Sequence, residues 1–272
     1  MQNIALPKTI HYEKSGEQNR SQIIIEPCYP GYGITLGNSV RRVLLSSLQG
    51  AAVVGVKIEG ISHEFTTLSN LREDILEFVM NLKQLRVKIF TDEIEKLDLK
   101  LHGKKEIEAK DISQNSNVEI VNPELSLGAI TDMAGLVDAE IYVKKGMGYE
   151  TVDMREDKRK EIGYIEIDSN YSPIVSVGVN IENVRVGKET NWEKLIIDIK
   201  TDGTIEPEVA FENSVKILIE QFSALLQDVE KPKKVDEDIE EDKDEGKDEG
   251  KQEEEINTED APKKRRGRPK KI

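Results

Sequence analysis

The character of the chain changes sharply near Glu230, and this change decides how much of its 272 residues can fold. Up to that point, apolar residues recur with the periods of helices and strands. Beyond it lies a Lys/Asp/Glu/Gly tract with the near-repeat KDEG-KDEG at 243–250. Such a tract buries too little apolar surface to offset the entropy lost on ordering. We therefore expect a folded body of about 230 residues and a disordered tail over 231–272.

The tail divides into two blocks of opposite charge. Residues 235–260 hold fifteen acidic residues and three lysines, whereas residues 261–272 hold seven basic residues and no acidic one. The formal net charge of the whole chain is -14. This average says little about binding to nucleic acid, which depends on the local pattern of charge.

Composition excludes several classes of protein. Cys28 is the only cysteine and the three histidines are scattered, so neither an internal disulfide nor a Cys/His zinc site is expected. The chain has no apolar run of about 18 residues to cross a membrane, and its N-terminus lacks the pattern of a signal peptide. We expect a soluble, cytoplasmic protein without a metal or cofactor.

The body combines short strands with three helices. Helices are predicted over about 38–49, 70–82 and 206–227, with Ser69 as the N-cap of the second and Pro207 at the start of the third. The strands do not alternate regularly with helices, so an α+β fold is favoured over a doubly wound parallel sheet. Strands are predicted at 23–26, 53–59, 85–90, 97–102, 118–121, 137–144, 162–168, 174–186 and 192–200.

The third helix carries two apolar rows. One spans an arc of about 120°, and a narrower one recurs at sevenfold spacing. They suit either one broad face on the chain's own sheet or an additional contact with another helix, for example from a second copy. The wide row comprises Phe211, Val215, Leu218, Ile219, Phe222, Leu225 and Leu226, and the narrow row Ala210, Ile217 and Ala224.

The glycines of the segment at 30–37 loosely mimic a dinucleotide-binding fingerprint. Gly31, Gly33 and Gly37 lie between a predicted strand and a predicted helix, and Glu59 ends a strand further on. However, the spacing is G-x-G-x-x-x-G, and no regular βαβ series follows. The alternative is that these glycines shape a tight turn. No arrangement of serine, histidine or carboxylates indicates a catalytic site.

The first helix combines a core stripe with an exposed arginine. Arg42, Ser46 and Gln49 project away from the core, and Leu45 lies at the edge of that face. An arginine beside an exposed leucine is the composition of an interface anchor, because guanidinium binds carboxylates bidentately while its stem packs. The alternative is an ordinary surface charge. The core stripe comprises Val40, Val43, Leu44 and Leu48.

A long block of the chain resembles the family of bacterial DNA-directed RNA polymerase alpha subunits. It spans residues 30–89, PGYGITLGNSVRRVLLSSLQGAAVVGVKIEGISHEFTTLSNLREDILEFVMNLKQLRVKI. The resemblance covers most of residues 1–230, in family order. Further matching blocks are VEIVNPELSLGAIT at 118–131, KKGMGYE at 144–150, IDSNYSPIVSVGVNIENVRVG at 167–187 and NWEKLIIDIKTDGTIEPEVAF at 191–211.

The resemblance implies a two-lobed α+β fold. Residues 1–49 and 169–230 would form a dimerisation lobe, and residues 50–168 an inserted, mostly β lobe, followed by the disordered tail at 231–272. The homodimer would be the platform on which the beta and beta-prime subunits assemble for transcription. The chain itself would be a non-catalytic subunit of this nucleotidyltransferase. The dimer interface would include Val40, Leu44, Leu48, Phe211, Val215, Leu218 and Phe222.

The resemblance also implies positions that contact the large subunits. The first helix would contribute Arg42 and Leu45. Glu77 and Lys83 would contribute from the second helix and the residues after it. Positions expected on the beta-prime side are Ile167, Ile174 and Lys194.

The tail departs from the family pattern. Members usually continue into a small helical domain that binds DNA, which we expect to be absent here because no periodic helices follow residue 230. In its place KKRRGRPKK, at 263–271, resembles an AT-hook. Gly267 lets the backbone approach a narrow minor groove, Pro269 favours an extended chain, and Arg266 and Arg268 suit the negative potential of A·T tracts. The alternative is a nonspecific basic terminus.

Three functions are thus carried forward. The first is an assembly subunit, or scaffold, of a polymerase. The second is a nucleotide-dependent enzyme that uses the glycine turn, and the third is a free-standing DNA-binding protein that acts through the basic tail. Association with beta and beta-prime separates the first from the other two.

Overall fold

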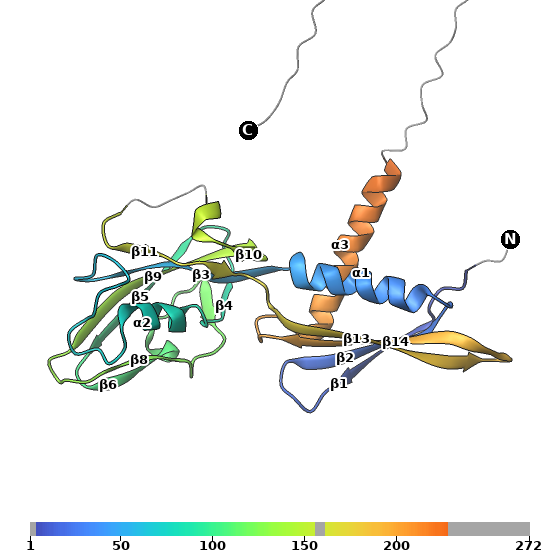
Figure 1. The fold of residues 1–272 in the computed structure, drawn as a ribbon, viewed down its shortest axis with the longest axis horizontal. Helices are drawn as coiled ribbons and strands as arrows, with labels where there is room; N and C mark the ends of the chain where they lie inside the picture. Colours follow the sequence, from blue (N-terminus) through green and yellow to red (C-terminus); the bar gives the residue numbers. More distant parts are fainter. Residues whose placement is uncertain (1–3, 156–160, 228–272) are drawn as a thin grey trace, which may run out of the picture. The chain divides into compact units, whose positions relative to one another are not determined.

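The computed structural model describes residues 4–155 and 161–227 (Figure 1). The described residues all belong to one compact unit. They combine β-sheets with three α-helices, which confirms the predicted α+β class. Among them, no helix has both the length and the apolar character needed to cross a bilayer. The tail predicted at 231–272 lies outside the described residues.

One four-stranded sheet is antiparallel and has the order β1-β2-β14-β13. The long strands β13 (Ile174–Val186) and β14 (Glu189–Thr201) form a hairpin. β2 (Arg20–Cys28) pairs with β14, and β1 (Thr9–Lys14) pairs with β2 as an edge strand. The sheet therefore joins segments from both ends of the described chain.

Two helices, α1 (Tyr32–Ser46) and α3 (Pro207–Gln227), pack on this sheet and contact each other (Figure 1). Their apolar stripes meet the β-branched residues of the strands in one core. Full burial of one such aliphatic side chain stabilises a fold by about 1.5–3 kcal/mol. This core includes Ile23, Ile25, Val40, Leu44, Leu48, Leu195, Ile197, Ile199 and Phe211.

A second four-stranded sheet has the order β11-β3-β9-β5. Its strands are β11 (Tyr164–Glu166), β3 (Gln49–Ile58), β9 (Leu136–Met147) and β5 (Glu95–His102). The short helix α2 (Ile75–Leu82) shares a core with this sheet through its buried face. That core includes Val53, Val56, Phe78, Leu82, Leu97, Leu99, Ile141, Val143 and Ile167.

Shorter elements complete the second group. Three two-stranded sheets and two turns of 3₁₀ helix lie around it. These are β4 (Val87–Ile89) with β7 (Val118–Ile120), β6 (Lys105–Glu108) with β8 (Ser126–Ile130), β10 (Tyr149–Glu150) with β12 (Ser169–Asn170), η1 (Ala109–Asp111) and η2 (Val152–Met154).

The helix predictions need three corrections. α1 begins at Tyr32, six residues before the predicted start, and ends at Ser46, so Gln49 is the first residue of β3 and not part of the helix. α2 begins at Ile75 with Asp74 at its N-cap position, so Ser69 is not the cap. The segment before α2 cannot continue the helix, because Asn70 adopts a left-handed φ of 68°. α3 begins at Pro207, as predicted.

All nine predicted strands are present; β13 has the predicted ends 174–186, and the other eight have at least one shifted end. The five strands that the prediction misses are short or lie at an edge. In β1 every residue is exposed, so the strand shows no burial pattern. The other missed strands are β6, β8, β10 and β12.

Candidate subunit interface

The glycine turn before α1 binds an anion that belongs to the chain itself. The backbone N–H groups of Gly31 and Gly33 each donate to one oxygen of the Glu193 carboxylate, both at 2.8 Å. Gly31 has the left-handed φ of 83° that favours glycine. The N–H groups that would cradle a phosphate are thus already bonded. This favours the structural turn over a nucleotide site.

Gly37 lets α1 lie close to the β13–β14 hairpin. A Cβ atom at this position would stand 2.7 Å from Cγ1 of Val179 and 2.9 Å from Cδ1 of Leu195. Real Cβ atoms are not found so close to other carbon atoms. The small residue fixes the depth of the helix and therefore which of its side chains remain outside.

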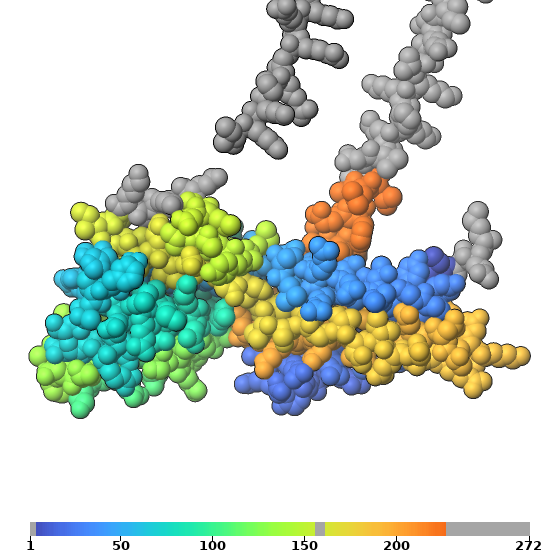
Figure 2. Space-filling model, viewed as in Figure 1, coloured from blue at the N-terminus to red at the C-terminus, as the bar shows by residue number. Residues whose placement is uncertain are grey.

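The outward side of α1 and the first residue of β3 form the first part of the candidate interface. We define the α1 face as Arg42, Leu45 and Ser46 of α1 together with Gln49 of β3, all of which are exposed. Figure 2 shows α1, in blue, as an uncovered ridge on the viewed side of the molecule. Arg42 forms no ion pair with any residue that the structure describes. Its guanidinium is available to a partner carboxylate.

The end of α1 meets the end of β9. Gln49 stands opposite Met147 in the ladder between β3 and β9, and a Cβ atom on Gly148 would lie 3.8 Å from the carbonyl oxygen of Ser46. Met147 and Tyr149 are 61% and 60% exposed. They therefore extend the α1 face with apolar surface that was not predicted as part of the site.

Asp168 connects this surface to the residue after α2. Its carboxylate accepts hydrogen bonds from the N–H of Val152 at 2.9 Å and from the hydroxyl of Tyr149 at 3.4 Å, and it lies 3.6 Å from Nζ of Lys83. The Val152 bond, followed by the charge of Lys83, outweighs burial and lowers the pKa of Asp168. The structure thus brings Lys83 close to Tyr149.

The remaining residue predicted on α2 is also at the surface. Glu77 is exposed, and so are the apolar side chains of Leu76 and Met80. Leu76, Met80 and Lys83 follow one another at i, i+4 and i+7, so they share one row of the helix surface. The outer side of α2 therefore carries both apolar and charged groups.

The predicted beta-prime positions are placed differently. Ile167 and Ile174 are only 2% and 7% exposed, and each belongs to one of the two larger cores. Little of either side chain lies at the surface in this conformation, and their contact with beta-prime stays a prediction. Lys194 is half-buried and lies 3.8 Å from Glu182.

The predicted dimer residues fall into two groups. Val40, Leu44, Leu48 and Phe211 are buried in the chain's own core, and Val215 and Leu218 are half-buried against it. Their apolar stripe continues along α3, whose C-terminal half extends past α1 (Figure 1). There the side chains face solvent with 58–78% of their surface exposed: Ile219, Phe222, Leu225 and Leu226.

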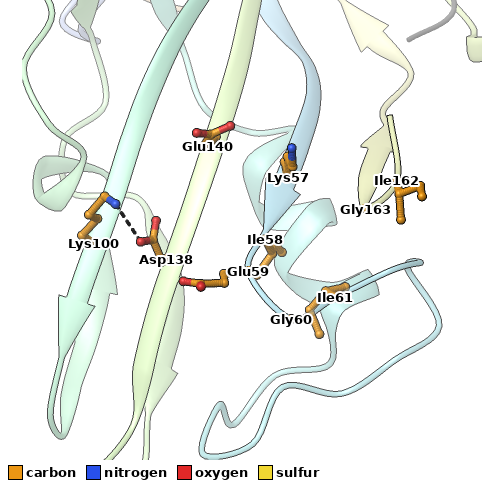
Figure 3. A pocket seen from close by; sticks show the side chains of 10 residues that line it. All are labelled: Lys57, Ile58, Glu59, Gly60, Ile61, Lys100, Asp138, Glu140, Ile162 and Gly163. Carbon is orange, nitrogen blue, oxygen red and sulfur yellow. Dashed lines mark hydrogen bonds and ion pairs between the residues drawn. The ribbon is translucent and has the colours of Figure 1, made fainter. Parts of the chain in front are cut away.

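A hollow of about 380 Å³ lies on the second sheet (Figure 3). Lysines and carboxylates line it, and Lys100 donates to Asp138 at 2.7 Å. Lys57, also in the lining, donates at 3.4 Å to Glu161, which lies outside it. The Asp138 bond raises the pKa of Lys100. Across the described residues, no cluster of His, Cys, Asp and Glu is arranged to hold a metal. The hollow is thus a salt-bridged sheet surface.

Comparison with known proteins places this fold in a family. Residues 56–172 match the model of the RNA polymerase Rpb3/RpoA insert domain. The chain is 42% identical over 220 residues to a protein of Maridesulfovibrio salexigens, which covers 81% of the chain and 63% of the relative. It is 43% identical to proteins of Symbiobacterium thermophilum and Desulforamulus reducens, covering 79% and 81% of the chain and 69% and 70% of those relatives.

All three relatives are named DNA-directed RNA polymerase subunit alpha. The chain belongs to the family of bacterial DNA-directed RNA polymerase alpha subunits. It spans less than two thirds of the length of several relatives, such as 63% of the Maridesulfovibrio protein and 60% of that from Nitratidesulfovibrio vulgaris.

Proposed function

We propose that the chain is a non-catalytic assembly subunit of DNA-directed RNA polymerase and acts in the cytoplasm. Two copies associate, and the pair provides the surface on which the beta and beta-prime subunits assemble for transcription. The observation that carries this proposal is the apolar stripe of α3, which runs past the chain's own core into solvent. The names of the relatives support the role of a polymerase subunit.

The same proposal divides the body into two lobes. Residues 1–49 and 169–230 form the dimerisation lobe, and residues 50–168 form the inserted lobe. The two larger cores support this division, because one draws its buried residues only from 23–48 and 174–211 and the other only from 53–167. A small third core crosses the boundary, where Tyr171 packs with Ala52, Val54 and Tyr142. The inserted lobe thus has its own apolar core.

A second copy is the occupant that we propose for the uncovered half of α3. Contiguous exposed apolar surface is uncommon on monomers and marks interaction sites. α1, which contacts α3, adds Ile34 and Leu36 with 55% and 36% of their surface exposed. The buried Val40, Leu44 and Phe211 then act indirectly, because they hold the two helices in place.

Introducing charge on α3 tests the dimer. The double substitution Phe222→Asp and Leu226→Asp in the full chain should give monomers, because each carboxylate would lose solvent in the interface. Ile162→Asp is the matched control, since Ile162 is 92% exposed and lies outside the dimerisation lobe. Light scattering coupled to size-exclusion chromatography gives the masses. An unchanged dimer mass for the double variant would rule out this interface.

For the large subunits we propose the α1 face and its surroundings. Arg42 and Leu45 contact beta, together with Glu77 and Lys83, while the surface near Lys194 faces beta-prime. The guanidinium of Arg42 is exposed and has no ion pair within 4–155 and 161–227, which supports this choice. Mixing the purified chain with beta and then beta-prime should yield stepwise larger complexes on size-exclusion chromatography. If the chain remains separate from both, the assembly role is wrong.

A contact between the tail and A·T-rich DNA is a second proposal, carried by KKRRGRPKK at 263–271. Arg266, Gly267, Arg268 and Pro269 lie outside the described residues and would enter the minor groove. Footprints of the polymerase with and without residues 261–272 test it on promoters with A·T-rich or G·C-rich upstream DNA. The intact tail should extend protection on the A·T-rich template only. Equal protection on all templates contradicts the proposal.

A further inference from the structure

The Arg155 side chain holds three separate segments of the chain together. The side chain is only 10% exposed. It donates to the carbonyl oxygens of Val54 and Ile167 and to Oγ of Ser169, each at 2.6 Å, and to the Glu150 carboxylate at 3.2 Å. Only a planar group with several N–H donors can serve acceptors in this fan-like arrangement.

A bulge in β3 supplies the central acceptor. The register between β3 and β9 shifts between Val53 and Gly55, so Val54 has no partner in the β9 ladder. Its carbonyl oxygen instead accepts from the N–H of Ile167 at 3.0 Å and from Arg155. The carbonyl of Val53 accepts from the Ser169 hydroxyl at 2.7 Å. At the bulge, the strand is thus bonded to the segment at 167–169, while the rest of β3 keeps its pairing with β9.

The charge of Arg155 is balanced by half-buried Glu150, which is bonded to buried Tyr171. Glu150 accepts from Arg155 and also from the Tyr171 hydroxyl at 2.7 Å. Burial would raise the pKa of Glu150, but the bonds from Tyr171 and Arg155 bring it below its ordinary value. A Cβ atom on Gly146 would meet the Tyr171 ring at 2.6 Å, so glycine leaves the space for that ring. These groups form a satisfied network, which is more rigid than isolated bonds.

This network reaches the candidate interface through Asp168. Asp168 lies between two residues that Arg155 binds, Ile167 and Ser169. Its carboxylate in turn binds the hydroxyl of Tyr149 and the N–H of Val152. We name residues 149–155 the β10–η2 segment, because they hold both elements. Arg155 anchors this segment at its end and fixes the carboxylate that binds it in the middle.

We propose that Arg155 is the positioning residue of the beta-binding surface. It holds the β10–η2 segment, whose Tyr149 and Met154 are 60% and 72% exposed, so that Tyr149 continues the α1 face and Met154 stays at the surface before a partner arrives. This proposal rests on the proposed function and adds an apolar region to the site. Its occupant is an apolar segment of the beta subunit, to which exposed Met and Tyr side chains adapt well. A preformed surface loses less conformational entropy on binding.

Two substitutions of Arg155 in the full chain test the proposal. Arg155→Met keeps much of the stem and removes all the donors, whereas Arg155→Lys keeps the charge but not the fork. With Arg155→Met we expect amide hydrogen exchange over residues 147–154 to accelerate about tenfold or more, while exchange in α3 stays unchanged. The affinity for purified beta should fall about tenfold, and the mass of the free chain should not change. For Arg155→Lys, we expect an exchange rate and an affinity for beta between those of the wild type and those of Arg155→Met.

The outcomes separate this proposal from the one on which it rests. If the wild-type chain does not bind beta, the proposed function is wrong. If it binds and Arg155→Met binds equally well despite faster local exchange, the positioning role is wrong. Unchanged exchange over 147–154 also overturns it. Should Arg155→Met not fold, Ser169→Ala removes a single acceptor side chain; a smaller change of both readouts in the same direction supports the proposal, and no change in either overturns it.

Discussion

The Glu193 carboxylate accepts a 2.8 Å hydrogen bond from the backbone N–H of Gly33, in the first turn of α1. The two residues are 160 positions apart in the sequence. A helix leaves its first N–H groups without internal partners, and a carboxylate at that end also interacts favourably with the helix dipole. One side chain of β14 therefore determines where α1 begins.

Removing this carboxylate should destabilise the fold. Glu193→Ala is expected to lower the free energy of unfolding by about 1–2 kcal/mol, because two backbone donors lose a charged acceptor. Glu193→Gln should lower the free energy of unfolding by less, since one acceptor oxygen remains. Glu182→Ala is the control, because that carboxylate is 52% exposed and pairs only loosely with Lys194. Urea titration measures each change; equal stability of the Glu193 and Glu182 variants would contradict the expectation.

Substitution of Gly37 tests the close approach of α1 to the hairpin. Gly37→Ala should destabilise the chain by about 1–3 kcal/mol through overpacking, reduced by the roughly 1 kcal/mol that alanine gains over glycine within a helix. Gly16→Ala is the control, since a Cβ atom there would meet nothing within 4 Å. Thermal unfolding compares the variants. A Gly37→Ala chain more stable than the wild type would show that Val179 and Leu195 can move aside.

Arg42→Ala should weaken binding to beta and leave the free chain intact. The side chain is exposed and has no ion pair among the described residues, so unfolding should shift by no more than about 0.5 kcal/mol. Loss of one partner from a charge pair buried on binding costs about 2–5 kcal/mol of affinity. Arg41→Ala is the matched control, because Arg41 points about 100° away around the same helix. Titration of each labelled variant with beta measures its affinity. If Arg42→Ala and Arg41→Ala lose equal affinity for beta, Arg42 is not the anchor.

Tyr171 should make the fold sensitive to alkali. Burial, followed by the bond to Glu150, raises the pKa of Tyr171 to about 12 from an ordinary value of 10.0. The folded chain therefore keeps this proton where the unfolded chain releases it. Retention of this proton contributes about 2–3 kcal/mol to the free energy of unfolding; the contribution is present below pH 10 and is lost as the pH rises towards 12. Tyr171→Phe should lack this component when unfolding is measured between pH 9 and 12; parallel pH profiles would contradict the raised pKa.

Local patterns predict only part of the fold. The helix at 206–227 and the strand at 174–186 follow from periodicity and a first-turn proline, which neighbouring residues alone determine. The start of α1 does not, because its N–H groups bind Glu193, far away in the sequence. β1 also escapes prediction, since an edge strand with every side chain exposed has no alternation to detect.

The candidate site shows the same division. Arg42 stands out in the sequence because the helix period separates it from the core stripe. Met147 and Tyr149 do not stand out, since whether such side chains are buried depends on tertiary packing. Ile167 and Ile174 were expected from family resemblance at a subunit contact, yet their side chains are buried in the cores. A shared sequence position does not by itself specify an exposed side chain.

The uncovered half of α3 has a consequence for how the protein responds to dilution. A helix turn whose apolar side chains face water gains little from packing and depends on weak intrinsic propensity. If a second copy covers these turns, their helical order and self-association form one coupled equilibrium. The circular dichroism signal at 222 nm should then decrease as the chain is diluted below its dimer dissociation constant. In the Phe222→Asp, Leu226→Asp variant, the signal per residue should be lower and independent of concentration.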